Sequence, residues 1–278
     1  MAASTESSPG HAVGGETRRV GRELVLDLVF RPLSNTLVPV LTRAGVAPTA
    51  VVLANALVGL VAALALARGQ LLVAAALLQV KTLLDNTDGQ LARASGRVTL
   101  LGRYLDTEAD LVVNAALFGA LGHVTGEPLL AAAGFVALTL VLAVDFNVTE
   151  LERETLRPAS AQPVRSGGRV ERLLERIYVA AFAPLDRLVR GLSEQRLERL
   201  VPVDAPAWRT HEARLAYRDR LTVTVLANLG LSTQLAVLGT CLVFGVPVLY
   251  LWIVLGCLLL IVPLQLRAER RARAALAA

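Results

Sequence analysis

Long apolar runs, separated by short polar stretches, dominate the pattern along this chain. About 20 residues are needed for a helix to cross the hydrocarbon core of a bilayer. Six runs approach or exceed that length: Pro48–Ala67, Leu71–Leu84, Thr99–Leu121, Pro128–Phe146, Leu221–Gly245 and Val248–Leu266. The second run is short, but the polar turn that carries Asp85 and Asp88 is expected to continue its helix toward the cytoplasm. The pattern therefore predicts an all-α polytopic membrane protein with six transmembrane helices.

Two regions interrupt the apolar pattern, residues 1–46 and residues 150–220. Residues 1–16 are rich in Gly, Ser and Ala and lack the hydrophobic region of a signal peptide, so we expect a disordered tail. In residues 17–46, apolar positions recur at helical spacing after Pro32, which is expected to break the preceding run. This spacing predicts an N-terminal interfacial amphipathic helix, and its apolar positions are Leu33, Leu37, Val40 and Leu41.

The second interruption, residues 150–220, holds half of the chain's 28 Lys and Arg residues. Leu and Val recur there at helical spacing between Arg and Glu. We expect a cytoplasmic Arg-rich insertion of one or two amphipathic helices, either resting on anionic lipid headgroups or simply solvated. The remaining divisions are residues 47–149, with transmembrane helices 1–4 and the catalytic motif, residues 221–266, with helices 5–6, and a basic cytoplasmic tail at 267–278.

Composition and charge support the membrane interpretation. Hydrophobic residues make up 54% of the chain and aromatic residues 4%, with a mean hydropathy of +0.56. Such apolar mass suits helices packed in lipid better than the alternative of a large soluble helical bundle. The net charge of +5 could suggest nucleic acid, but the aromatic residues are few and no nucleic-acid motif appears. Two cysteines without a CxxC pair argue against a disulfide framework or a zinc site.

Arginine placement predicts the orientation. With the N-terminus inside and six crossings, the outer loops receive only Arg68, whereas the inner segments receive the other arginines. This asymmetry is what the positive-inside rule predicts. We therefore expect a protein integral to the cytoplasmic membrane, with both termini and the active site facing the cytoplasm.

Four acidic residues stand out at the inner ends of two neighbouring apolar runs. Asp85 and Asp88 are three residues apart, and Asp106 and Asp110 are four apart, so each pair shares one helix face. Small residues between the pairs are expected to let the chain reverse so that the two faces meet: Gly89, Ser95 and Gly96.

Charges in this position are costly without a ligand. A carboxylate at mid-membrane costs about 2.5–3.5 kcal/mol on insertion scales, and four that lie close together repel one another. Hard carboxylate oxygens select Mg²⁺, Mn²⁺ or Ca²⁺ over zinc. The cluster therefore predicts a site for two divalent ions, although interhelical polar contacts or solvated helix ends would use the same residue types.

The spacing Asp85-x2-Asp88-Gly89-x2-Ala92-Arg93-x8-Gly102-x3-Asp106-x3-Asp110 resembles the signature of the CDP-alcohol phosphotransferases, also called CDP-alcohol phosphatidyltransferases. All eight fixed positions are filled. The six-helix layout and the preceding interfacial helix also look like that family, so the resemblance covers about residues 32–147 and 221–266, with the insertion outside it.

The resemblance implies roles for these residues. Asp85, Asp88 and Asp106 would bind two Mg²⁺ or Mn²⁺ ions, and Asp110 would complete the metal site and act as general base on the acceptor hydroxyl. That hydroxyl would attack the β-phosphate of a CDP-linked donor and expel CMP. Members are commonly homodimers. The nucleotide would be contacted by Gly89, Ala92, Arg93 and Gly102.

Four further positions bear on the site. Lys81, four residues before Asp85, would either neutralise the acidic cluster or bind the acceptor's phosphate, and neutralisation is favoured. Asn114, four after Asp110, would line the acceptor pocket or, more commonly, make an interhelical hydrogen bond. The first span departs from the family at Thr49 and Val52, so the sequence gives no basis for a contact from that span.

We expect transfer of a substituted phosphate group from CDP-diacylglycerol to a soluble alcohol, in phospholipid biosynthesis. The main alternative is a soluble CDP-alcohol donor with a lipid or polyol acceptor. A divalent-cation transporter would spread its acids over several spans, and an inactive membrane scaffold would have lost part of the motif. Neither pattern matches this sequence.

Overall fold

The computed structural model describes residues 23–156, 167–181, 183–199 and 220–277, and every regular element in them is a helix. The predicted tail at residues 1–16 lies outside this part of the chain. The elements are a π-helical turn η1 (Leu26–Phe30) and the α-helices α1 (Arg31–Arg43), α2 (Pro48–Ala67), α3 (Leu71–Ala94), α4 (Leu100–Thr125), α5 (Pro128–Leu156), α6 (Arg169–Ala181), α7 (Ala183–Glu198), α9 (Arg220–Ala227), α10 (Leu231–Val243) and α11 (Pro247–Ala277).

Helix boundaries follow from proline and glycine. The helices α2, α5 and α11 each begin with a proline, which has no N–H to lose in the first turn. The chain reverses between α3 and α4 at Gly96, whose φ of +66° is left-handed. There the Arg97 N–H donates to the Ala92 carbonyl at 2.9 Å, a C-cap pattern that glycine permits.

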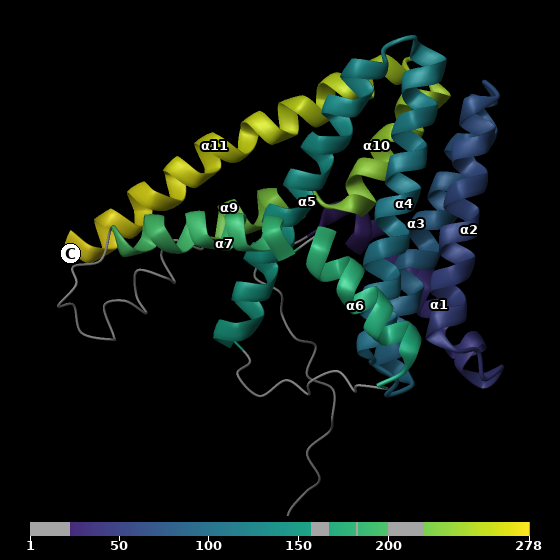
Figure 1. Ribbon diagram of the computed structural model, residues 1–278, viewed down its shortest axis with the longest axis horizontal. Coiled ribbons are helices and arrows are strands. Elements are labelled where there is room, and N and C mark those ends of the chain that lie inside the picture. The colour runs from purple at the N-terminus through teal and green to yellow at the C-terminus, as the bar shows by residue number, and fades with distance from the viewer. Residues whose placement is uncertain (1–22, 157–166, 182, 200–219, 278) are drawn as a thin grey trace, which may run out of the picture.

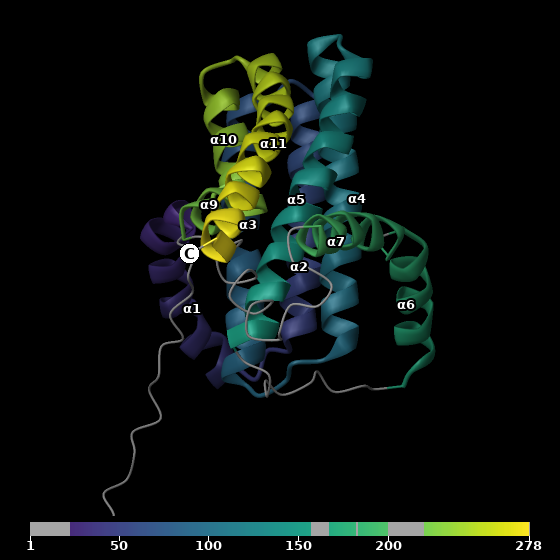
Figure 2. The same cartoon turned by 90° about the vertical axis from the view of Figure 1, so that its left-hand side faces the viewer.

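The helix α2 lies against both α3 and α4, and α3 also packs against α1 and α10 (Figure 1). The helix α3 therefore has several packing partners, and α3 and α4 share α2 as a neighbour. In the second view, α6 runs along α4 (Figure 2), whereas α7 packs against α5 and α6 and extends to the side of the bundle (Figure 1).

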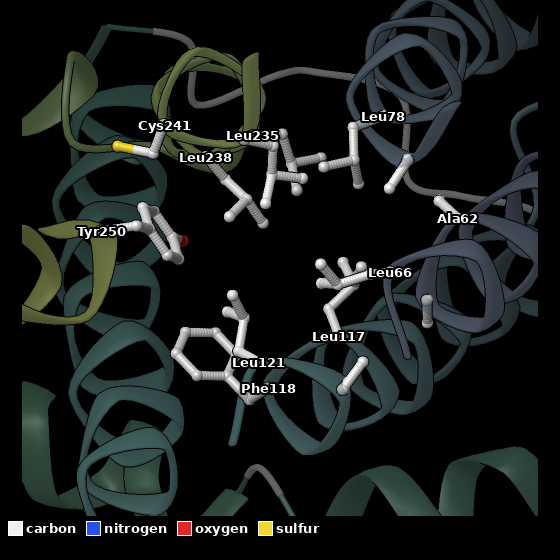
Figure 3. Close-up of a cluster of buried hydrophobic side chains, with 14 of the residues drawn as sticks. Ala62, Leu66, Leu78, Leu117, Phe118, Leu121, Leu235, Leu238, Cys241 and Tyr250 are labelled. Carbon is white, nitrogen blue, oxygen red and sulfur yellow. The ribbon is translucent and has the colours of Figure 1, made fainter. Parts of the chain in front are cut away.

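A large apolar cluster fills the space between these helices (Figure 3). Leu66, Leu121 and Leu251 have no exposed surface. The ring of Phe118 lies 6.0 Å from that of Phe135 and 5.9 Å from that of Tyr250, which joins α4 to α5 and α11. The residues that α4 contributes to this cluster all follow Asp110 in the sequence.

Among the described helices, three are long and apolar enough to cross a membrane, within Pro48–Ala67, Pro128–Asn147 and Pro247–Ala274. A fourth span is counted if the bent pair α9–α10 is taken as one. The helices α3 and α4 have 24 and 26 residues, but the motif places charged side chains along them. The prediction of a membrane protein is thus supported, but by three or four candidate spans rather than six.

The predicted span Leu221–Gly245 is not one straight helix, because the chain bends by 53° between α9 and α10. Gly230 is extended, with φ −63° and ψ 169°, and is the N-cap residue of α10. At the break, Asn228 Oδ1 accepts a hydrogen bond from the Leu24 N–H at 2.9 Å. The residues between α9 and α10 therefore bind the N-terminal segment. The hydrophobic periodicity of one stretch of sequence cannot reveal such a long-range contact.

The predicted interfacial helix is present as a helix. Pro32 lies in its first turn and does not separate it from the preceding run, because η1 continues directly into α1. Val38 packs with Leu91 of α3 in a small cluster, while Leu33 and Val40 are exposed. The placement of this helix at a membrane surface stays a prediction.

Residues 150–220 form helices where they are described. The helix α5 continues to Leu156, ten residues beyond the predicted end at Phe146, and α6 and α7 follow. The α6 ring of Tyr178 lies 5.2 Å from that of Tyr104 on α4. Likewise, the predicted tail after Leu266 is not separate from the last span, because α11 runs on to Ala277.

Candidate active site

The four aspartates lie on the facing sides of α3 and α4. Asp85 and Asp88 occupy the C-terminal half of α3, and Asp106 and Asp110 occupy the N-terminal half of α4. Because α3 and α4 run in opposite directions through one tight turn, these halves lie at the same end of the bundle. The helical spacing predicted from the sequence is therefore realised in both elements.

Three of the aspartates form a group that fits a metal ion. One carboxylate oxygen from each of Asp85, Asp88 and Asp106 lies within 4.8 Å of the others. Asp88 Oδ2 and Asp106 Oδ1 are buried and have no hydrogen-bond partner among the described residues. Buried carboxylate oxygens without donors are costly, and oxygen-only ligands suit hard divalent ions. The donor set and its unsatisfied atoms therefore fit a divalent cation.

The fourth aspartate lies beside this group and is paired with a lysine. Asp110 Oδ1 accepts a hydrogen bond from Lys81 Nζ at 2.7 Å. The same ammonium group lies 3.8 Å from Asp85 Oδ1. Lys81 has no exposed surface, so its charge is compensated within the site by carboxylates from both helices. This contact agrees with the neutralising role favoured from the sequence.

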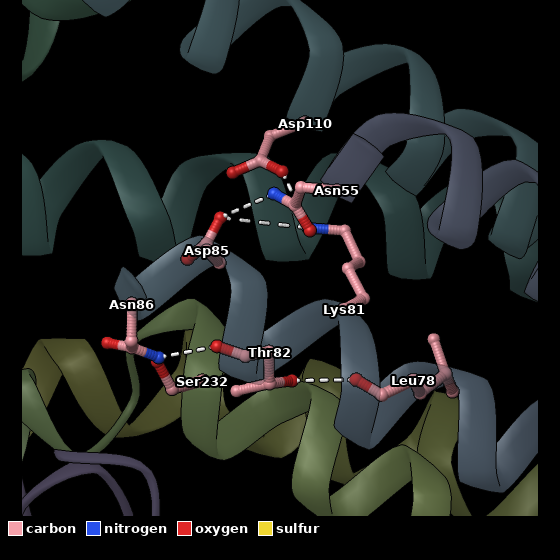
Figure 4. A network of polar contacts seen from close by, with 8 residues as sticks. All are labelled: Asn55, Leu78, Lys81, Thr82, Asp85, Asn86, Asp110 and Ser232. Carbon is pink, nitrogen blue, oxygen red and sulfur yellow. Dashed lines mark hydrogen bonds and ion pairs between the residues drawn. The ribbon is translucent and has the colours of Figure 1, made fainter. Parts of the chain in front are cut away.

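Two residues of α2, not identified from the sequence, complete this part of the site. Asn55 Nδ2 donates to Asp85 Oδ1 at 3.0 Å, and Asn55 is buried (Figure 4). One turn later, a Cβ on Gly59 would lie 2.5 Å from Val113 Cγ1 and 3.2 Å from Lys81 Cδ. Asn55 is the amide side chain of a largely apolar helix, and in a membrane helix such a residue indicates an interhelical hydrogen bond.

The residues assigned to the nucleotide are placed differently along the two helices. Gly89 is inside α3, not in the reversal, and a Cβ there would lie 3.4 Å from Arg93 Nη1. Ala92 and Arg93 follow on the last turns of α3, with Arg93 exposed. Gly102 is in the first turn of α4, where its N–H donates to Thr99 Oγ1 at 3.1 Å. The expectation that Gly89 helps the chain reverse is therefore wrong; Gly96 does this.

Asn114 lies one turn beyond Asp110 and is buried. Its Oδ1 accepts no hydrogen bond from the described residues. An open groove of about 660 Å³ lies farther along α4, and its lining residues include Phe118, Gly122 and Phe135 but none of the aspartates. The groove is thus separate from the acidic site.

Polar contacts from α1 and α10 hold the motif-bearing half of α3. Thr87 Oγ1 donates to Ser34 Oγ of α1 at 3.1 Å, and both side chains are fully buried. On the α10 side, Asn86 Nδ2 lies 3.4 Å from Ser232 Oγ. These contacts fix the helix rotation that presents Asp85 and Asp88 to α4.

The family model of the CDP-alcohol phosphatidyltransferases matches residues 45–183, which is half of the chain. The chain belongs to the CDP-alcohol phosphatidyltransferase family. No curated protein and no solved structure matches it. The match differs in extent from the resemblance seen in the sequence, because it continues through α6 and ends before α9.

Membership establishes the class of chemistry. Proteins of this family are metal-dependent transferases that move a substituted phosphate from a CDP-alcohol to an alcohol acceptor. The acidic group on α3 and α4 is where the described residues could bind a metal. Both helices that carry this group lie within the region that the family model matches.

Proposed function

We propose that this protein transfers a phosphatidyl group from CDP-diacylglycerol to the hydroxyl of a water-soluble alcohol and releases CMP, as a step in phospholipid biosynthesis. The observation that carries the proposal is the gathering of three aspartates from α3 and α4, with the fourth next to them. A divalent-cation pathway would need acids spread along several spans, whereas these lie at one end of two helices.

The proposed reaction is an exchange of one phosphoester partner for another. The acceptor oxygen forms a bond to the β-phosphorus, and the bond from that phosphorus to the oxygen of CMP breaks. Asp110 takes the hydroxyl proton, because a neutral alcohol is a weak nucleophile without a base. CMP departs with the electron pair of the broken bond, and the product is a phosphodiester.

The residues proposed to hold metal are Asp85, Asp88 and Asp106, with Asp110 adjacent, and we propose two Mg²⁺ or Mn²⁺ ions. Divalent ions there would offset the negative charge of the diphosphate. The three carboxylates fix where the diphosphate lies along α3 and α4. Asp88 is buried and Asp85 and Asp106 are half-buried, which limits water in the site and strengthens electrostatic interactions there.

The CDP moiety is proposed to lie over the loop side of the site. Gly89 and Gly102 lack a side chain that would keep the nucleotide away from the backbone. The exposed guanidinium of Arg93 is suited to a phosphate oxygen. Ala92 lies on the same turn and adds little bulk.

We further propose that α3 and α4 cross the membrane with the four other spans, giving six, and that the α3–α4 loop faces the cytoplasm. Arg93 in the last turn of α3 and Arg97 in the loop agree with the positive-inside rule. A site at this face can admit a lipid donor and a soluble acceptor together. The resemblance to the family also supports a homodimer.

Purified protein in lipid nanodiscs, incubated with Mg²⁺ and labelled CDP-diacylglycerol, tests the proposal directly. A panel of soluble alcohols is added one at a time, and CMP release and product mass are measured. We expect CMP and a matching phosphatidyl product with at least one alcohol. The matched control is Asp85→Asn, which should weaken metal and nucleotide binding together. Turnover only with soluble CDP-alcohols and a lipid acceptor would reject this donor assignment.

A further inference from the structure

We propose that Lys81 is a positioning residue that divides the four aspartates between two tasks. It holds Asp110 as the proton acceptor and leaves the other three aspartates to the metal. This inference rests on the proposed function, because it assumes that Asp110 is the base. It concerns Lys81 because, among the residues that the structure describes, this is the buried cation that lies near acids of both α3 and α4.

The burial of Lys81 indicates what its ammonium group does. With no exposed surface and Asp110 Oδ1 at 2.7 Å, the amine is committed to a carboxylate inside the protein. A buried ammonium is tolerated only when it is paired and hydrogen-bonded. An acceptor phosphate arriving from water would first have to displace Asp110. The geometry therefore favours a role inside the protein over direct substrate binding.

The lysine also orients the carboxylates it contacts. In Figure 4, one Asp110 oxygen meets Lys81 and the other points away from it. Asp85 uses a single oxygen, Oδ1, for both Asn55 and Lys81, so its second oxygen has neither contact. Asp85 and Asp110 thus each have one oxygen that contacts protein side chains. The second oxygen of Asp85 is left for the metal, and that of Asp110 for the acceptor proton.

The stem of Lys81 is held by close packing against α2. A Cβ at Gly59 would lie 3.2 Å from Lys81 Cδ and still closer to Val113 of α4. Because cores resist added volume, glycine at this position sets the lateral place of the lysine. The position of Asp110 therefore depends on a residue that carries no charge and touches no substrate.

The test replaces Lys81 and separates kcat from KM. Lys81→Met should lower kcat about a hundredfold, the scale of a misplaced reacting group, with the KM of the acceptor within about twofold of wild type. Magnesium binding, followed by the shift in melting temperature, should persist. Arg68→Met, which removes a cation from the α2–α3 turn, serves as the control and should leave kcat unchanged.

Gly59→Ala provides a second variant in case Lys81→Met does not fold. It retains every charge but displaces the lysine stem and Val113, and we expect a lower kcat at an unchanged acceptor KM. Wild-type kcat in either folded variant would overturn the inference. A raised acceptor KM at wild-type kcat would do so too, since Lys81 would then bind substrate.

Asp110→Asn separates the two levels of the proposal. If this variant turns over normally, Asp110 is not the base, and the proposed function loses its proton acceptor. If it is inactive while Lys81→Met and Gly59→Ala match wild type, only the positioning role of Lys81 fails.

Discussion

The apolar and polar halves of α3 and α4 differ in whether their buried atoms have partners. In the apolar half, Leu78, Leu117 and Leu121 are fully enclosed by side chains from α2, α10 and α11. In the polar half, Asp88 Oδ2 and Asp106 Oδ1 are buried without a donor among the described residues. The same pair of helices thus carries a satisfied core at one end and an unsatisfied site at the other.

The difference shows how local instability is tolerated. Like charges held close together disfavour the folded state unless a cation compensates them. Lys81 supplies one positive charge and contacts Asp85 and Asp110, which leaves Asp88 and Asp106 without an ion pair to any residue that the structure describes. The apolar half has no such cost and holds the helices together. Strain of this kind at a functional site is expected where the structure around it is firmly packed.

The largest expected effect comes from removing the proposed base in the polar half. Asp110→Asn should lower kcat about a thousandfold, within the usual contribution of general acid–base catalysis. The amide keeps the size of the carboxylate but cannot take the proton. CDP binding, measured by equilibrium dialysis with labelled nucleotide, should stay close to wild type.

Asp27→Asn is the control, because Asp27 pairs with Arg31 at the start of the described chain, outside the acidic group. It should retain wild-type kcat. Normal turnover in Asp110→Asn would contradict the base assignment. A parallel loss of CDP binding would place Asp110 among the nucleotide or metal contacts instead.

A smaller effect is expected from removing one acid of the metal group. Without metal, Asp88→Asn should melt at a higher temperature than wild type, because the repulsion from Asp85 and Asp106 is reduced. With saturating Mg²⁺ the order should reverse. A ligand at a hundred times its Kd stabilises by about 2.7 kcal/mol, and the variant should lose most of that gain. A full Mg²⁺ shift in Asp88→Asn would remove this residue from the site.

Much of the acidic site could be predicted from sequence because its information is local. Asp85 and Asp88, and then Asp106 and Asp110, are spaced for one helix face, and the turn between them is short. The helix α3 continues through the aspartates, as expected. Local spacing was therefore sufficient to place the acids together.

The contribution of α2 could not be predicted in the same way. Asn55 meets Asp85 across 30 positions of the sequence, and its partner depends on how α2 and α3 pack. The bend at Asn228 likewise depends on a contact with Leu24 from the other end of the chain. The predicted ends of α5 and α11 come too early in the sequence for another reason. Charged residues end an apolar run but do not end the helix.

The last comparison concerns the apolar half, where Leu121→Ala should affect stability and leave catalysis intact. Leu121 has no exposed surface, so truncation leaves a cavity among the packed helices. We expect this substitution to lower the free energy of unfolding by about 2 kcal/mol, at the low end for such changes. The effect is small because lipid is as apolar as the core, so that only packing contacts are lost. Thermal melting in nanodiscs measures the loss, and Leu57→Ala, an exposed leucine of α2, is the matched control. The kcat of the folded variant should equal that of wild type. A lower kcat would show that the two halves are coupled, and that the firm packing around Phe118 and Leu121 helps to hold the aspartates in place.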